Sequence, residues 1–187
     1  MKKIAVLASH NGSALNVLHN ASLNHILDIN IALVISNNTN APALQNADKY
    51  GIKNHLVNSK TDENPDTRIY SLLKEYNCDY IFLSGYMKKL SSEITKDFKV
   101  INSHPSLLPK YGGKGMYGRF VHEAVIKNKE TISGVTIHEV NDVYDEGKII
   151  LQKELRILDG ETSESLESRI KELEKSAIIE GLQQYLK

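Results

Sequence analysis

The sequence predicts an α/β protein with a doubly wound, mostly parallel open sheet of the Rossmann-like kind, an antiparallel pair of strands at its C-terminal edge, and helices on both faces. Two observations lead to this prediction. Through the first half, short β-branched apolar runs alternate with helical stretches, which is the pattern of right-handed βαβ units. After residue 104, two longer strands follow each other across a short acidic loop, and so short a connection favours antiparallel pairing.

The first half supplies the parallel strands and their connecting helices. The predicted strands are Ile4 to Ala8, Ile29 to Ser36, His55 to Val57, Tyr80 to Ser84 and Val100 to Ser103. The predicted helices run from Ala14 to about Asn24, from Pro42 to Tyr50 and from Thr67 to Tyr76. Pro42 suits a first helical turn, and Gly51 suits the position just past a helix end.

The second half supplies the antiparallel edge and the last helix. Its predicted elements are a Gly-rich loop from Tyr111 to Gly118, a helix from Arg119 to Asn128, strands from Thr131 to Val140 and from Lys148 to Leu158, and a loop from Asn141 to Gly147 between them. Thr162 or Ser163 can cap the final helix, whose predicted buried stripe is Leu166, Ile170, Leu173 and Ala177.

Composition limits the class of protein. The 187 residues suit a single domain, 1–187, and 23 basic residues balance 23 acidic ones, which disfavours nucleic-acid or acidic-membrane partners. The apolar run Ile4–Ala8 is too short for a signal peptide or a membrane span, so we expect a cytoplasmic location. The single cysteine, Cys78, is expected to be a small buried residue, and no Cys/His cluster has zinc-site spacing, so no metal is predicted.

A candidate anion site follows the first strand, from Ser9 to Ala14. Free backbone N–H groups and the helix dipole at such a turn can hold a phosphate. The loop has neither the Gly-x-Gly-x-x-Gly spacing of a dinucleotide site nor the Walker A pattern. Taken alone, it is equally well an ordinary strand-to-helix turn.

A candidate catalytic segment runs from Asn102 to Pro109, at the end of the last first-half strand. Residues two apart on a strand share a face, so Asn102 and His104 are expected to point the same way. An amide donor can stabilise a developing oxyanion while an imidazole moves the proton, as acyl transfer requires. The alternative is a structural histidine before a proline.

Two further loops follow strands near the expected crevice. The loop Asn141–Gly147 carries a carboxylate towards the same side, or is a solvated acidic turn, and it lacks EF-hand spacing. The segment Gly85–Leu90 either walls a pocket for a flat apolar ring or packs Met87 and Leu90 into the core.

Together these segments resemble the phosphoribosylglycinamide formyltransferases of purine synthesis, within the formyltetrahydrofolate-dependent formyltransferases. The resemblance covers nearly the whole chain. Its most specific parts are Asn102-x-His104-Pro-Ser-Leu-Leu-Pro109 and Gly134-Val-Thr-Ile-His138 leading into Asp145-x-Gly147. It implies transfer of a formyl group from 10-formyltetrahydrofolate, as co-substrate, to the amine of glycinamide ribonucleotide, with no metal and with only small-molecule partners, in a monomer or homodimer.

The resemblance also implies roles for particular residues. Asn102 would contact the formyl oxygen, His104 would act as general acid, and Asp145 would orient and polarise His104, directly or through water. The implied substrate-binding residues are Gly12, Ser13 and Ala14 for the phosphate, and Glu174 with Lys171 for the ribose. The implied folate-binding residues are Arg68, Met87, Lys88, Lys89, Leu90, Asn102, Asn141, Asp142, Val143, Tyr144 and Asp145.

The sequence departs from the family pattern at several positions. His10 stands where the family usually has Gly, Ala14 where it usually has Asn, and Glu146 where a small residue is usual. The 111–118 loop is either a mobile lid or a plain connection. His138 is open between a packed strand residue and support for the site, whereas the histidines expected at the surface or its boundary are His19, His25, His55 and His122.

Two alternatives stay open. One is a formyltransferase acting on another amine, such as a nucleotide sugar or initiator methionyl-tRNA, although those relatives usually carry an additional C-terminal domain. The other is a catalytically silent folate- or nucleotide-binding module, which would not require all of Asn102, His104 and Asp145. A formyltetrahydrofolate deformylase is disfavoured because it would need an additional N-terminal domain.

Overall fold

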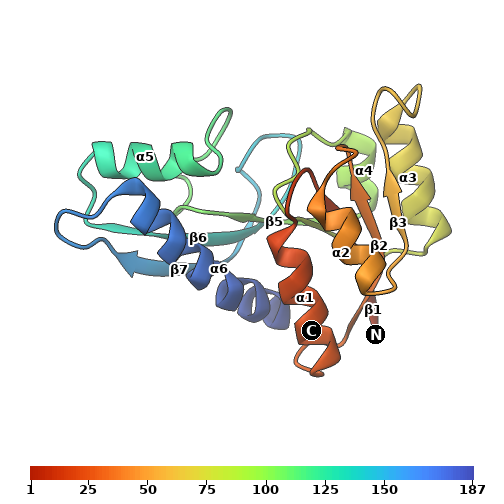
Figure 1. Ribbon diagram of the computed structural model, residues 1–187, viewed down its shortest axis with the longest axis horizontal. Helices are drawn as coiled ribbons and strands as arrows, with labels where there is room; N and C mark the ends of the chain where they lie inside the picture. The colour runs from red at the N-terminus through yellow and green to blue at the C-terminus, as the bar shows by residue number, and fades with distance from the viewer. The chain divides into compact units, whose positions relative to one another are not determined.

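The computed structural model describes all 187 residues, and the chain forms two compact units, Met1–Ile101 and Asn102–Lys187 (Figure 1). The hydrogen-bonded strand order is β3-β2-β1-β4-β5-β6-β7 in one seven-stranded sheet. This order, with parallel strands first and an antiparallel pair last, confirms the predicted fold class. No helix combines the length and the apolar character that crossing a membrane requires.

The first unit is built on four parallel strands. They are β1 (Lys2–Ala8), β2 (Ile29–Ser36), β3 (Asn54–Leu56) and β4 (Tyr80–Leu83). In register, Val6 of β1 lies beside Val34 of β2 on one side and Phe82 of β4 on the other. Residues Ile4 to Ala8 are fully buried, as expected for a strand that is covered on both faces.

Helices connect these strands. They are α1 (Ser13–Leu23), α2 (Pro42–Lys49), α3 (Pro65–Glu75) and the short α4 (Ser92–Asp97). The crossovers from β1 to β2 and from β2 to β3 run in one direction along the sheet, and the crossover from β3 to β4 runs in the other. Because such crossovers are right-handed, α3 lies on the opposite face from α1 and α2 (Figure 1).

Two details of this unit differ from expectation, and one agrees with it. Helix α3 begins at Pro65 rather than Thr67, because the Asn64 side chain caps it by accepting from the Thr67 N–H at 3.2 Å. Helix α4 was not predicted, since only Ile94 of its six residues is buried. Cys78 is buried, as predicted, and burial raises the pKa of its thiol to about 11.

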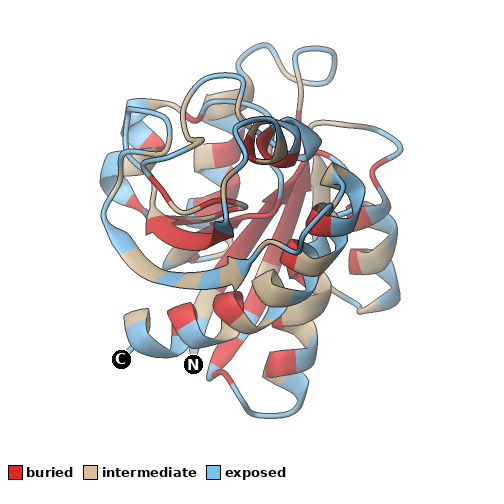
Figure 2. Ribbon diagram, turned by 90° about the vertical axis from the view of Figure 1, so that its left-hand side faces the viewer, coloured by how far each residue is buried: buried red, intermediate tan, exposed pale blue.

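The second unit takes up the end of β5 (Lys99–His104) and continues with α5 (Arg119–Lys127), β6 (Ile132–Glu139), β7 (Ile149–Arg156) and α6 (Ser163–Tyr185). Strands β6 and β7 are antiparallel, as predicted, with Val135 opposite Lys153. Helix α6 packs on both strands and on α5. Figure 2 shows the buried residues gathered on the strands and on the inner sides of the helices.

The cap and the stripe predicted for α6 are largely confirmed. The Thr162 hydroxyl accepts from the Ser165 N–H at 3.2 Å. The buried residues of the helix are Leu166, Ile170, Ala177, Ile178, Gly181 and Leu182, whereas Leu173 is only half-buried. A Cβ on Gly181 would lie 3.1 Å from the Ile137 side chain, so this glycine brings the helix close to β6.

Candidate active site

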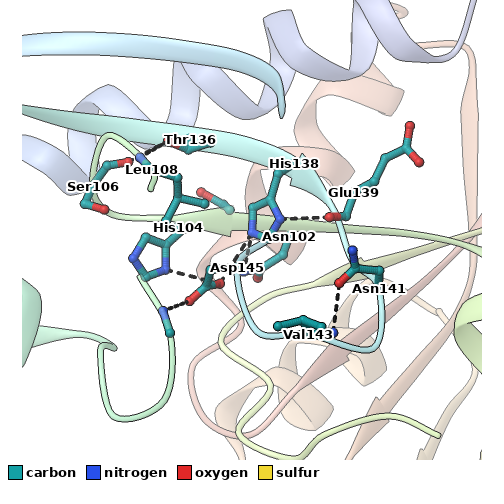
Figure 3. Close-up of polar contacts among 12 residues, drawn as sticks. Asn102, His104, Ser106, Leu108, Thr136, His138, Glu139, Asn141, Val143 and Asp145 are labelled. Atoms are coloured by element: carbon teal, nitrogen blue, oxygen red, sulfur yellow. Dashed lines mark hydrogen bonds and ion pairs between the residues drawn. The ribbon is translucent and has the colours of Figure 1, made fainter. Parts of the chain in front are cut away.

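Four polar side chains of the second unit converge, and we call them the polar cluster: Asn102 and His104 from β5, His138 from β6, and Asp145 from the loop between β6 and β7. Figure 3 shows the two imidazoles on either side of the Asp145 carboxylate. Asn102 and His104 lie two residues apart on one strand and reach the same cluster, as their spacing predicted.

The His104 ring is held by a hydrogen bond at one nitrogen and faces a carboxylate with the other. Its Nε2 lies 2.8 Å from the Tyr111 carbonyl oxygen, which can only accept, so Nε2 carries a hydrogen and donates it. Its Nδ1 faces Asp145 Oδ1 at 3.6 Å, and the His104 side chain is only 5% exposed. Nδ1 is therefore the nitrogen available for proton transfer.

Tyr111, which the sequence reasoning did not identify, is itself anchored. Its backbone has a φ of 57°, unusual for a residue other than glycine. Its hydroxyl donates to Glu130 Oε1 at 2.9 Å and accepts from the Asn128 amide at 3.0 Å. The contact with His104 is made by the backbone carbonyl of Tyr111 rather than by its side chain, so no motif in the sequence marked it.

Asp145 occupies a constrained turn. Its φ is 57°, and its Oδ2 accepts from the Gly113 N–H at 2.8 Å. Two residues on, a Cβ at Gly147 would lie 1.6 Å from the Glu139 carbonyl oxygen, so only glycine fits there. The Asp-x-Gly pattern is thus explained by close backbone contact between the loop and the end of β6.

His138 is 1% exposed and belongs to the polar cluster. Its Nδ1 lies 2.8 Å from the Glu139 carbonyl oxygen, while its Nε2 lies 3.2 Å from Asn102 Nδ2 and 3.6 Å from Asp145 Oδ1. Burial lowers its pKa, although the Glu139 carbonyl and Asp145 act in the other direction. Of the two interpretations open for His138, the contacts favour support for the site.

The ribose residues suggested by the resemblance lie on α6. Glu174 Oε1 accepts from the Ser103 hydroxyl at 2.6 Å, which links this carboxyl to β5 within the second unit. Burial raises the pKa of Glu174, and the bond from Ser103 only partly offsets that rise. Lys171 instead extends into solvent, where its ammonium pairs with Glu167 Oε1 at 2.5 Å.

The candidate phosphate loop lies in the first unit. Gly12 has a φ of 60° and stands directly before α1, where a Cβ would come within 2.8 Å of Ala43. The Ala14 N–H donates to the Ser84 hydroxyl at 3.0 Å, so it does not point freely at an anion. This bond leaves the N–H groups of Gly12 and Ser13 as the candidates for holding an anion, and it corrects the expectation that all three are free.

The loop after β4 is tied to this phosphate loop. The Met87 N–H donates to the Ser9 hydroxyl at 2.8 Å, and that hydroxyl donates to Asn37 Oδ1 at 2.6 Å. Met87 is 43% exposed, whereas Leu90 is 6% exposed. Of the two interpretations left open for this segment, core packing therefore holds for Leu90 and is wrong for Met87. Lys88 and Lys89 are exposed.

The other folate positions suggested by the resemblance are at the surface. Arg68 borders a hollow of about 570 Å³ at the start of α3, where its Nε lies 3.9 Å from Asp62 Oδ1. In the second unit the loop residues before Asp145 are exposed: Asn141, Asp142, Val143 and Tyr144. The Asn141 side chain shapes this loop by accepting from the Val143 N–H at 2.9 Å.

One histidine expectation is wrong. His122 was expected at the surface or its boundary, but it is 2% exposed on the inner side of α5. Its Nδ1 has no hydrogen-bond partner, and burial lowers its pKa. The buried residues of α5 are Val121, His122 and Val125, so His122 lies on the same side of the helix as two apolar residues.

Comparison with known proteins agrees with this architecture. The formyl transferase family model matches residues 2–182. The chain is 33% identical to the chloroplastic phosphoribosylglycinamide formyltransferase of Arabidopsis thaliana over 96% of its own length, and it spans 63% of that relative, less than two thirds. It is 37% identical to the phosphoribosylglycinamide formyltransferase of Haemophilus influenzae, covering 93% of this chain and 82% of that one.

A solved structure matches equally broadly. The glycinamide ribonucleotide transformylase 1 of Symbiobacterium toebii superposes with a TM-score of 0.91 at 27% identity, covering 99% of this chain and 87% of that one. The likeness therefore includes both compact units.

Proposed function

Because the chain belongs to the formyl transferase family, we propose that it transfers the formyl group of 10-formyltetrahydrofolate to the amine of glycinamide ribonucleotide. The observation that carries this proposal is the arrangement of Asn102, His104 and Asp145, with His104 Nδ1 facing the carboxylate at 3.6 Å. The names of the Arabidopsis and Haemophilus relatives support the choice of substrate.

The proposed reaction uses these side chains to manage charge on the transferred carbon. The neutral amine attacks the formyl carbon and forms a tetrahedral intermediate, whose oxygen is stabilised by an Asn102 N–H and by protonated His104. The carbon–N10 bond then breaks as a proton passes to N10, and the attacking amine gives up a proton in exchange. Asp145 orients and polarises His104, directly or through water. The products are the formylated amine and tetrahydrofolate.

Substrate binding in this proposal uses the residues that the family resemblance suggests. The N–H groups of Gly12 and Ser13, at the positive end of α1, hold the phosphate, and the first turn of that helix carries no acidic residue to oppose an anion. Glu174 accepts hydrogen bonds from the ribose hydroxyls. The folate ring lies against Met87 to Leu90 and Asn141 to Asp145, and Arg68 receives the glutamate tail.

The test is release of tetrahydrofolate from purified protein given both substrates. Asn102→Ala and His104→Ala are each expected to lower kcat by about a hundred- to a thousand-fold, the usual cost of removing an oxyanion donor, with little change in KM. Asn24→Ala, at an exposed site beside α1, serves as the control and should leave turnover unchanged.

Other outcomes would redirect the proposal. Release with a different amine, but not with glycinamide ribonucleotide, would move the assignment to the other formyltransferase. Tight binding of both substrates without release would favour the silent binding module. Wild-type turnover in Asn102→Ala would remove that side chain from the mechanism.

We infer a cytoplasmic enzyme acting as a monomer or homodimer on small molecules. The Arabidopsis relative is named as chloroplastic, so location differs among relatives of this kind.

A further inference from the structure

His138 and Asn102 share a hydrogen bond whose direction can be deduced. The Glu139 carbonyl only accepts, so the contact of 2.8 Å from His138 Nδ1 requires a hydrogen on that nitrogen. A neutral imidazole carries one N–H, which leaves a lone pair on Nε2. At 3.2 Å from Nε2, the Asn102 amide nitrogen must then be the donor.

We propose that His138 is a positioning residue that fixes the orientation of the Asn102 amide, so that its nitrogen rather than its oxygen is presented to the formyl group. The amide has two N–H bonds. One is held by His138 Nε2, and the other remains available for the developing oxyanion. This inference rests on the proposed formyl transfer and deepens it.

A charged His138 would reverse this arrangement. With hydrogens on both ring nitrogens, Nε2 would donate towards Asp145 Oδ1, 3.6 Å away, and would no longer accept from Asn102. The amide would then have to turn its oxygen to Nε2, and the free side of the amide would lose the donor that the oxyanion needs. Neutral His138 is therefore part of the working site.

The surroundings of His138 favour the neutral form. The charged or titratable groups that act on it are Asp145 from the β6–β7 loop, which favours its protonation, and His104 from β5, which opposes it. Burial is the largest influence and also opposes protonation. The net effect is a lowered pKa.

The strand that carries His138 is buried along most of its length. The pairing of β6 with β7 shifts register between Ile137 and His138, so Ile137 lies opposite Leu151 whereas His138 lies opposite Ile149. The additional residue at this point is Ile150, so the bulge lies on β7 opposite His138. Residues Ser133 to His138 are all buried, so β6 is covered on both faces and His138 is shielded from water.

A double-mutant cycle with Asn102 tests the proposal. His138→Leu removes the hydrogen-bond acceptor and replaces the imidazole with an apolar side chain of similar size. We expect it to lower kcat by at least about tenfold with KM little changed, because a misoriented amide forfeits part of the roughly hundred- to thousand-fold effect of an oxyanion donor. In the Asn102→Ala background, His138→Leu should lower kcat by less than about threefold, because no amide remains to be oriented.

The proposal would be overturned if the effect of His138→Leu on kcat were independent of Asn102. If His138→Leu lowers kcat by the same factor with and without Asn102, or leaves the wild-type value unchanged, His138 does not act through the amide. If instead Asn102→Ala alone has wild-type turnover, the catalytic scheme fails, which is a separate outcome.

His138→Gln provides a second variant if the leucine variant does not fold. The glutamine oxygen can accept from Asn102 but does not titrate. We expect kcat within about tenfold of wild type and a shallower loss of kcat on the acid side of the pH profile, because one proton-sensitive group is gone. A loss as large as that of Asn102→Ala, or an acid limb identical to wild type, would contradict the proposal.

Discussion

At the scale of single residues, two backbone carbonyls determine which ring nitrogens face the reaction. The Tyr111 carbonyl takes the Nε2 hydrogen of His104, and the Glu139 carbonyl takes the Nδ1 hydrogen of His138. As a result, His104 Nδ1 and His138 Nε2 both face Asp145 Oδ1, each at 3.6 Å. One carboxylate oxygen thus faces two imidazoles in opposite tautomers, and it can accept a hydrogen bond from either ring only when that ring carries a second hydrogen.

The variant Glu174→Gln distinguishes the role of this carboxyl in binding the nucleotide from its effect on the stability of the fold. The folded protein raises the pKa of Glu174, so the native state holds its proton more tightly than the unfolded chain does. The unfolding free energy therefore falls as the pH rises from the ordinary glutamate pKa through the raised value. Glutamine removes this slope and can still accept from Ser103. We expect stability at pH 8 equal to or above wild type, together with a higher KM for the nucleotide.

Urea unfolding at pH 5 and pH 8, with steady-state kinetics, checks this expectation. Glu172→Gln is the matched control, because Glu172 lies on the same helix, is 71% exposed and pairs only with Lys175. A KM unchanged in Glu174→Gln would remove that carboxyl from nucleotide binding.

At the scale of elements, glycines allow the β6–β7 hairpin to contact its neighbours. A Cβ at Gly134 would lie 2.1 Å from the Lys153 carbonyl oxygen on β7 and 2.6 Å from Leu107. Leu107 belongs to the segment that follows His104, so this packing also supports the catalytic segment. The carbonyl that a side chain at Gly147 would strike, that of Glu139, is the one that holds His138.

Alanine substitutions at Gly134 and at Gly181 of α6 should therefore destabilise the protein to different degrees. At Gly134 the clash is with backbone, which cannot move aside, and we expect a loss of more than about 3 kcal/mol in unfolding free energy. At Gly181 the overlap is smaller, with Cγ2 of Ile137 at 3.1 Å, and alanine also favours the helix, so we expect a smaller loss of about 1–2 kcal/mol. Urea titration of both variants measures the difference, and equal losses would contradict the argument.

At the scale of the whole molecule, histidines link folding to pH. Burial lowers the pKa of His55 in the first unit and of His122 and His138 in the second. Below the ordinary histidine pKa the unfolded chain binds protons that the native state resists. Stability is therefore complete above that pKa and is lost as the pH falls towards the lowered folded values.

His122→Leu should weaken this acid sensitivity. His122 is buried with an unpaired Nδ1, and an unsatisfied buried polar atom typically costs about 1–3 kcal/mol. We expect the variant to be at least as stable as wild type at pH 8 and to lose less stability between pH 7 and pH 5. Urea unfolding of the variant and the wild type at pH 8, pH 7 and pH 5 measures both effects. If the variant loses as much stability between pH 7 and pH 5 as the wild type does, His122 does not contribute to the acid sensitivity.

Local patterns in the sequence determined most of the architecture. Alternation of β-branched runs with helical stretches predicted the parallel strands, and the short acidic connection predicted the antiparallel pair β6 and β7. Two-residue spacing on a strand placed Asn102 and His104 on one face. These predictions succeed because periodicity, capping and turn residues act between neighbours in the chain.

Only the tertiary structure decided the hydrogen-bond partners. The Ala14 N–H is taken by Ser84, His122 is buried, and His138 joins Asn102 across 36 residues of sequence. Each outcome depends on which distant groups arrive beside the residue and on the direction in which a carbonyl or amide points. Residue types and spacings do not encode those directions, because a hydrogen bond is set by the geometry of both partners after the chain has folded.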